Sequence, residues 1–244
     1  MQTLVLFTLR ISLMIAGTAI GFYSCGQDVR PGKYNESSGQ LGGDSNSLNV
    51  ESWALPNDLA RWLHTEYDYR DAGGNGIIIQ NGYPRGGGYQ DTQGVIRSYE
   101  SGGTRYGFGI LWSRIINQSD SPIEVSITLP ADSISFRDSP GGHCRVYLPP
   151  NKMTIENLSD YSYGINGVTA FLNSHFEGQT HLEKVIDQDE EHMFYVVLLS
   201  HFPDGGGGGI RTGFSLDQDK LFYEVTAGSL GVQAFPSGYI ARQE

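Results

Sequence analysis

Residues 122–129 alternate strictly between apolar and polar side chains, and this pattern limits the fold more than any other feature of the 244-residue sequence. Apolar residues lie at positions 123, 125, 127 and 129, with Glu, Ser and Thr between them. Successive side chains of a strand point to opposite faces, so the pattern predicts a strand with one face in a core and the other in water. Such a sheet must pack against a second layer.

Further strand-like segments follow at short intervals, rich in β-branched and aromatic residues and separated by Gly, Asn or Asp. The predicted strands cover residues 77–79, 106–117, 145–148, 182–186, 193–199, 210–216, 221–225 and 232–235. Residues 193–199 are apolar without interruption, as in a central strand of a sandwich core. The polar stretch 117–122 indicates a hairpin connection between its two flanking strands.

Two short helices are predicted, at residues 55–63 and 168–175. In the first, Asn57 or Asp58 suits the helix start, and Leu59 recurs with Trp62 and Leu63 at helical spacing, so these side chains should pack on the sheet. Many short strands with few helices predict a mainly β fold. We expect one β-sandwich domain over residues 51–244, immunoglobulin-like or jelly-roll-like, with one or two short helices.

Residues 1–25 have the features of an export signal. Arg10 precedes a mainly apolar run at residues 11–23. That length fits a signal-peptide core, whereas a membrane span needs about 20 residues. A longer run starting at Leu4 would place Arg10 in hydrocarbon, at a cost of about 2.5–3.5 kcal/mol. An uncleaved anchor is therefore the less favoured alternative.

The leader ends in a segment, residues 22–25, that resembles a bacterial lipobox. Ser24 and Cys25 fit the pattern, while Phe22 and Tyr23 are bulkier than usual. The resemblance implies that the Cys25 thiol takes a diacylglycerol, that cleavage leaves Cys25 as the new N-terminus, and that its acyl chains hold the protein in the lipid bilayer of the outer membrane. The alternative is ordinary signal cleavage near residues 16–19.

Residues 26–50 are rich in Gly, Ser, Asn and Asp and nearly free of large apolar groups. Such a segment cannot bury enough surface to fix its conformation, so it predicts a flexible tether that spans about 25–30 Å. Acidic residues directly after the lipidated Cys are typical of surface-exported lipoproteins, and here only Asp28 fits. The periplasmic and surface sides of the membrane both remain open.

The chain is acidic, with 16 Lys and Arg against 27 Asp and Glu and a net charge of −11. It has no basic stripe with interleaved aromatics, so nucleic acid is not an expected partner. Anionic lipid would repel the domain, and membrane contact should come from the anchor. Lipidation of Cys25 leaves Cys144 without a disulfide partner, and we expect Cys144 to be a small buried hydrophobe rather than a catalytic thiol.

Histidines and carboxylates gather in one part of the sequence: His175, His181, His192 and His201, with Asp187, Asp189, Glu190 and Glu191. Their spacings match no zinc pattern, so we expect no metal and no cofactor here. The acidic run 187–191 reads as a solvated turn between two strands. The Gly-rich loops at residues 85–89 and 205–209 lack the residues of a phosphate cradle and are predicted to be flexible hairpins.

Aromatic residues recur in a set that could stack sugars: Tyr83, Tyr89, Tyr99, Tyr106, Tyr161, Tyr163, Trp53 and Trp62. Packing in the core or in hairpins explains them equally well. No two carboxylates can be placed at glycosidase separations and no Gly-x-Ser-x-Gly elbow occurs, so no catalytic residue is predicted. The tripeptide 132–134, Asp-Ser-Ile, resembles a short O-glycosylation site of Bacteroidetes envelope proteins.

Residues 72–244 resemble a domain of unknown function in flavobacterial-type lipoproteins of the Bacteroidetes. The stretches 75–89, 147–154 and 211–223 carry the resemblance. It implies a bacterial envelope origin and a single domain, and it implies no activity. The expected function is that of a membrane-anchored envelope lipoprotein with a binding or assembly role toward a protein or glycan partner. The alternative is a hydrolase acting on envelope glycans or peptides.

Overall fold

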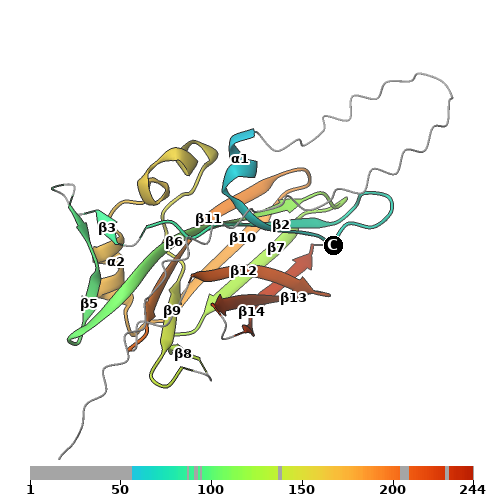
Figure 1. Cartoon of the computed structure of the whole chain (residues 1–244). Coiled ribbons are helices and arrows are strands. Elements are labelled where there is room, and N and C mark those ends of the chain that lie inside the picture. The colour runs from blue at the N-terminus through green and yellow to red at the C-terminus, as the bar shows by residue number, and fades with distance from the viewer. Residues whose placement is uncertain are drawn as a thin grey trace, which may run out of the picture. The chain divides into compact units, whose positions relative to one another are not determined.

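Most strand residues lie in two antiparallel sheets that stack face to face (Figure 1). The structure, a computed structural model, describes residues 57–243 apart from residues 87, 91–92, 94, 137–138, 204–208 and 229–230. The predicted signal, the lipidation site at Cys25, the tether and Trp53 therefore lie outside the described residues. The fold is mainly β, and the predicted β-sandwich with few short helices is confirmed.

The larger sheet has seven strands. Its order is β1 (Leu63–Asp68), β2 (Ile77–Gly82), β6 (Thr104–Asn117), β11 (Glu191–His201), β9 (His143–Tyr147) and β8 (Ile134–Ser135), and β5 (Tyr99–Ser101) pairs with the beginning of β6. The smaller sheet has five strands, in the order β10 (Thr180–Ile186), β7 (Ile123–Leu129), β14 (Val232–Arg242), β13 (Lys220–Ala227) and β12 (Ile210–Asp217). A separate two-stranded ribbon joins β3 (Tyr89–Gln90) to β4 (Ile96–Arg97).

The first hydrophobic core fills the space between the two sheets. The four apolar side chains of β7 are completely buried there, and its polar side chains are only half-buried. Tyr223 of β13 lies in the same sheet and joins these apolar side chains, and Leu111 of β6 and Val196 of β11 face them from the other sheet. The predicted alternation in residues 122–129 is confirmed, because only one face of β7 meets the core.

A second core lies on the other face of the seven-stranded sheet. Four short helical segments cover this face: α1 (Asn57–Trp62), η1 (Ile155–Ser159), η2 (Tyr161–Gly164) and α2 (Val168–His175) (Figure 1). Their Leu59, Leu158 and Leu172 pack against Trp112 of β6 and Val197 of β11. The central strands β6 and β11 are thus buried on both faces, which explains the uninterrupted apolar run at residues 193–199.

The two predicted helices are confirmed, the second with the predicted bounds. The first ends at Trp62, and Leu63 already begins β1. Leu59 is buried and Trp62 and Leu63 pack against the second core, as expected. Strands β1, β3, β4, β5 and β8 were not predicted. In the described part of the chain, no helix combines the length and the hydropathy needed to span a bilayer.

The predicted hairpin at residues 117–122 is wrong. Strand β6 belongs to the seven-stranded sheet and β7 to the five-stranded sheet, so the segment between them crosses from one sheet to the other. Asn117 holds this crossing: its side-chain amide donates to the carbonyl oxygens of Ser121 at 2.9 Å and Ile186 at 3.0 Å. A polar, turn-forming composition is common to both kinds of connection and does not say which sheet the next strand joins.

The two Gly-rich loops are not hairpins either. Residues 85–89 join β2 to β3, and residues 205–209, of which only Gly209 is described, lie between β11 and β12; neither pair of strands is hydrogen-bonded together. The described part of the first loop is held in place. Arg85 exchanges two backbone hydrogen bonds with Ile110, at 2.7 and 2.8 Å. These two bonds connect the loop to β6 at Arg85.

Strand β14 lies in the middle of the five-stranded sheet, between β7 and β13. Its approach to β7 requires glycine at one position: Gly238 has a φ of +153°, and a Cβ there would lie 1.8 Å from the Ser126 carbonyl oxygen. Pro236 sits in the same strand next to a register shift opposite Leu221 and Phe222. A bulge of this kind is where a sheet tolerates proline.

Candidate functional site

The predicted aromatic set divides into buried and accessible rings. Tyr99, Tyr106 and Tyr163 are buried in the second core, so packing explains them. Tyr83 and Tyr161 are each 39% exposed. Tyr89 and Trp62 are half-buried at the edge of the same core. Trp62, Tyr89 and Tyr161 lie on the helix-covered side of the seven-stranded sheet, whereas the Tyr83 ring lies beside Arg211 of β12. Tyr89 borders two cavities.

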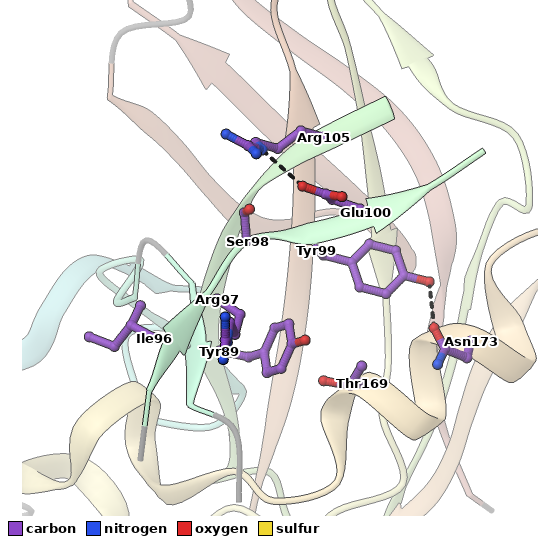
Figure 2. A pocket seen from close by; sticks show the side chains of 9 residues that line it. All are labelled: Tyr89, Ile96, Arg97, Ser98, Tyr99, Glu100, Arg105, Thr169 and Asn173. Atoms are coloured by element: carbon purple, nitrogen blue, oxygen red, sulfur yellow. Dashed lines mark hydrogen bonds and ion pairs between the residues drawn. The ribbon is translucent and has the colours of Figure 1, made fainter. Parts of the chain in front are cut away.

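These two cavities form the candidate site, which we call the Tyr89 groove. The first, about 560 Å³, is drawn in Figure 2 and lies between the strands β3 to β5 and helix α2. The second, about 690 Å³, extends along η2 and the beginning of α2. Both are lined by Tyr89 and Thr169, so they adjoin each other. Each volume is in the range of small-ligand sites.

Tyr89 is positioned by the Gly-rich loop that precedes it. A Cβ on Gly88 would lie 2.4 Å from the Arg97 carbonyl oxygen, so glycine is needed where β3 approaches β4. The Tyr161 hydroxyl donates to the Gly88 carbonyl at 3.1 Å, and the Tyr89 ring contacts Phe108 edge-on at 6.1 Å between ring centres. The first two contacts fix the backbone just before Tyr89, and Phe108 of β6 contacts the Tyr89 ring itself.

Polar groups line the other side of the first cavity. Figure 2 shows Thr169 and Asn173 of α2 facing Tyr89 and Tyr99. The Tyr99 hydroxyl donates to Asn173 Oδ1 at 3.2 Å, and Arg105 Nε donates to Glu100 at 3.0 Å (Figure 2). Burial raises the pKa of Tyr99 above its ordinary value of 10, so the phenol stays a proton donor at neutral pH. The cavity thus combines ring faces with amide, hydroxyl and carboxylate groups.

The second cavity contains strained backbone and the start of a helix. Ser162 and Tyr163 have φ values of 47° and 55°, in the left-handed region that residues other than Gly and Asn rarely adopt. Helix α2 begins after Gly167 without a side-chain cap, and its first residues line the cavity. Strained residues of this kind cluster at binding sites. Ser162 lines the same cavity, and its buried hydroxyl has no hydrogen-bond partner among the described residues.

Two tyrosine hydroxyls, those of Tyr163 in the strained turn and of Tyr195 in β11, fix this turn by hydrogen bonds. The Tyr163 hydroxyl donates to the Tyr83 carbonyl at 2.7 Å, and the Tyr195 hydroxyl donates to the Tyr163 carbonyl at 2.6 Å. Beside them, the Arg85 guanidinium lies 4.3 Å from the Trp62 ring centre and 5.1 Å from that of Tyr163, and it donates to the Leu158 carbonyl at 2.8 Å. These hydrogen bonds and ring contacts fix the backbone of η2 that lines the groove.

The histidine and carboxylate cluster considered from the sequence does not assemble. Residues 187–190 are exposed and form the expected turn, although the strands it joins lie in different sheets. His175 lies on α2, which covers the seven-stranded sheet, and His181 lies on β10 of the five-stranded sheet. Both side chains are exposed. No group of three or more His, Cys, Asp or Glu that could hold a metal occurs among the residues that the structure describes.

Two further predicted positions are placed clearly. Cys144 is completely buried in the sandwich core as a free thiol, as predicted, and burial raises its pKa to about 12. Asp132 and Ser133 lie in the connection between β7 and β8, where they line a cavity of about 540 Å³ together with Phe235 of β14. In the Asp-Ser-Ile tripeptide, Asp132 and Ser133 are therefore in a loop, and Ile134 begins β8.

The comparisons with known proteins gave no relative: no protein-family model and no curated protein sequence matches the chain.

Several residues of the groove were missed by sequence reasoning. Thr169, Asn173 and Asp160 had no signal of their own, since each is a common surface residue on or beside a short helix. Gly164 and Gly167 gave a usable signal, because two glycines three positions apart beside Tyr163 indicate left-handed backbone. Both do have positive φ, 69° and 70°.

Proposed function

We propose that the protein is a lipid-anchored component of the bacterial cell envelope whose sandwich domain binds a glycan in the Tyr89 groove without turning it over. The observation that carries the proposal is the composition of the groove: accessible rings of Tyr89 and Tyr161 beside Asp160, Thr169 and Asn173. Sugars present apolar C–H faces together with hydroxyl groups. A site with few ring faces and several directional polar groups suits them.

The groove is a binding site whose parts are fixed before the ligand arrives. Tyr89, Tyr99 and Tyr161 each have a hydrogen bond or ring contact that fixes the side chain. A rigid site avoids the entropic cost of ordering its side chains when the ligand binds. This favours a binding role over an assembly role that needs a large flat surface.

The binding half of the proposal is tested on a glycan array that includes bacterial surface polysaccharides. The wild-type chain should bind a subset of glycans, and Tyr89→Ala and Tyr161→Ala should each weaken binding about tenfold through loss of a ring contact. Tyr239→Ala is the matched control, because Tyr239 is 42% exposed on the five-stranded sheet, away from the groove. Equal losses in all three variants, or no glycan binding, would refute the proposal. Release of hydrolysis products would favour the alternative of an envelope hydrolase.

The anchoring half is tested independently by mass spectrometry of the membrane fraction, which should find Cys25 acylated. A Cys25→Ala chain should leave that fraction, because the acyl chains supply the membrane affinity. Retention of the Cys25→Ala chain in the membrane would show that another segment anchors the protein.

A further inference from the structure

His143 and His201 face each other across two neighbouring strands, outside the Tyr89 groove. They are paired residues in the register of β9 and β11, at the first position of one strand and the last of the other. Their ring centres are 5.4 Å apart and the ring planes meet at 46°. Directly paired residues of antiparallel strands project from the same face, so the backbone itself fixes this imidazole pair.

Each ring directs one nitrogen at a backbone carbonyl. His143 Nδ1 lies 3.1 Å from the Gly141 oxygen, and His201 Nδ1 lies 3.1 Å from the Arg105 oxygen. A carbonyl can only accept, so Nδ1 carries the proton in both rings and Nε2 of the neutral imidazole keeps its lone pair. Histidines that bind metals show this same arrangement, in which the second ring nitrogen donates to a carbonyl or carboxylate.

The spacing of the two rings also suits a shared metal ion. A metal lies about 2.0–2.1 Å from a ligating histidine nitrogen, so two imidazoles bound at a tetrahedral angle have ring centres roughly 5 Å apart. The observed separation is 5.4 Å. The buried Tyr106 supports both rings from one side, with its ring centre 5.8 Å from that of His143 and 6.0 Å from that of His201. Both histidines are half-buried, so solvent reaches them.

We propose that His143 and His201 bind one divalent transition-metal ion through their Nε2 atoms, with solvent in the remaining positions. Imidazole ligands favour zinc, nickel and copper over magnesium and calcium. With only two protein ligands the site is open, so a carboxylate or imidazole of a partner molecule can complete it. Of the cluster considered from the sequence, only His201 takes part, and its partner here comes from a strand more than fifty residues earlier.

Calorimetric titration of the full-length chain, purified in detergent and stripped with EDTA, tests the site with zinc and nickel chlorides. We expect one ion per chain with micromolar affinity. His143→Ala and His201→Ala should each weaken binding at least about tenfold, since loss of an outer-shell partner alone typically costs that much. His181→Ala is the control, because His181 is exposed on the edge strand β10 of the other sheet. Undiminished binding by both variants would overturn the proposal.

Two measurements on the wild-type chain test the site even if the variants fail to fold. With copper(II), the electron paramagnetic resonance spectrum should show splitting from two nitrogens, and a spectrum without it would contradict a two-histidine site. Zinc at about 100 times its Kd should raise Tm by about 5–10 °C, because it binds only the folded chain. A Tm that zinc leaves unchanged would also count against the proposal. His143→Gln offers a variant of closer size if His143→Ala unfolds.

Discussion

The side-chain amide of Asn81 pairs with both backbone polar groups of Phe214, in a strand of the opposite sheet. Asn81 Oδ1 accepts the Phe214 N–H at 2.9 Å, and Asn81 Nδ2 donates to the Phe214 carbonyl at 3.0 Å. Strand β12 lies at the edge of its sheet, and the Asn81 amide gives Phe214 the two hydrogen bonds that a neighbouring strand would otherwise provide. The same side chain also accepts from Ser113 at 2.9 Å and donates to Thr65 at 3.0 Å, so a buried polar group is fully hydrogen-bonded.

Asn81→Ala should lower the free energy of unfolding by about 2–3 kcal/mol, because it leaves the buried polar groups of Phe214 and Ser113 without partners. Asn81→Asp should also destabilise, since a buried carboxylate cannot donate to the Phe214 carbonyl. Urea denaturation measures both. Asn166→Ala is the control, because Asn166 is exposed. Equal midpoints for Asn81→Ala and Asn166→Ala would show that the pairing adds nothing to stability.

Arg85→Lys should destabilise the chain by about 1 kcal/mol although it keeps the charge. The guanidinium stacks on Trp62 and Tyr163, and a lysine ammonium cannot make two planar contacts and also donate to Leu158 in the same way. Thermal denaturation followed by tryptophan fluorescence is the measurement. The comparison variant is Arg61→Lys, since Arg61 is exposed and contacts only the Trp62 ring among these rings, at 4.8 Å. If Arg61→Lys lowers the stability as much as Arg85→Lys, the contacts of Arg85 with the two rings are not the cause of the loss.

Cys144 should react with thiol reagents only when the chain unfolds. Its side chain is completely buried, and burial raises the pKa of the thiol to about 12, so almost no thiolate forms at pH 8. Labelling with a chromogenic disulfide at pH 8 should be slow in buffer and complete within minutes in guanidinium chloride. Fast labelling of Cys144 in the native chain, located by peptide mass spectrometry, would contradict the burial.

The stability should decline as the pH falls below neutrality, in part through His192. Burial, and then the positive charges of Lys184 and Lys152, lower the pKa of His192 below its ordinary value of 6.5. The folded chain therefore takes up this proton less readily than the unfolded chain. The stability is retained above about pH 6.5 and is lost as the pH falls from there through the lowered pKa.

Urea denaturation between pH 7 and pH 5 measures this effect, with His192→Gln as the variant. The variant should lose less stability than the wild type over this range, because its side chain does not titrate. Superimposable pH profiles for the two chains would exclude His192 as a source of the acid sensitivity.

Local patterns predicted the parts of the fold that depend on one segment at a time. Residues 122–129 show alternation because β7 meets a core on one face only, and the continuous run at residues 193–199 reflects a strand buried on both faces. Strand β1 escaped prediction because its sequence, LHTEYD, is mostly polar, as suits the edge of a sheet. The predicted hairpin at residues 117–122 failed because turn chemistry does not determine which sheet receives the next strand.

The candidate sites depended on contacts between distant segments, which the sequence alone does not show. The rings of Tyr99 and Tyr161 look alike in the sequence, and only the packing of the second core buries the first and leaves the second accessible. The His143–His201 pair arises from the register of β9 on β11. Cys144, by contrast, was predictable because a lone cysteine in an apolar strand has few other roles.

The central place of β14 in the five-stranded sheet determines when that sheet can form. Residues 232–242 separate the β10–β7 pair from the β13–β12 pair, so neither half meets the other until these residues have been synthesised. Strand β13 pairs with both β12 and β14, and these three strands form a local meander, whereas the pairing of β14 with β7 joins residues more than one hundred positions apart. Non-local pairing of this kind slows folding. The β10–β7 pair and the β13–β12 pair therefore each keep an unpaired strand edge until β14 inserts between them.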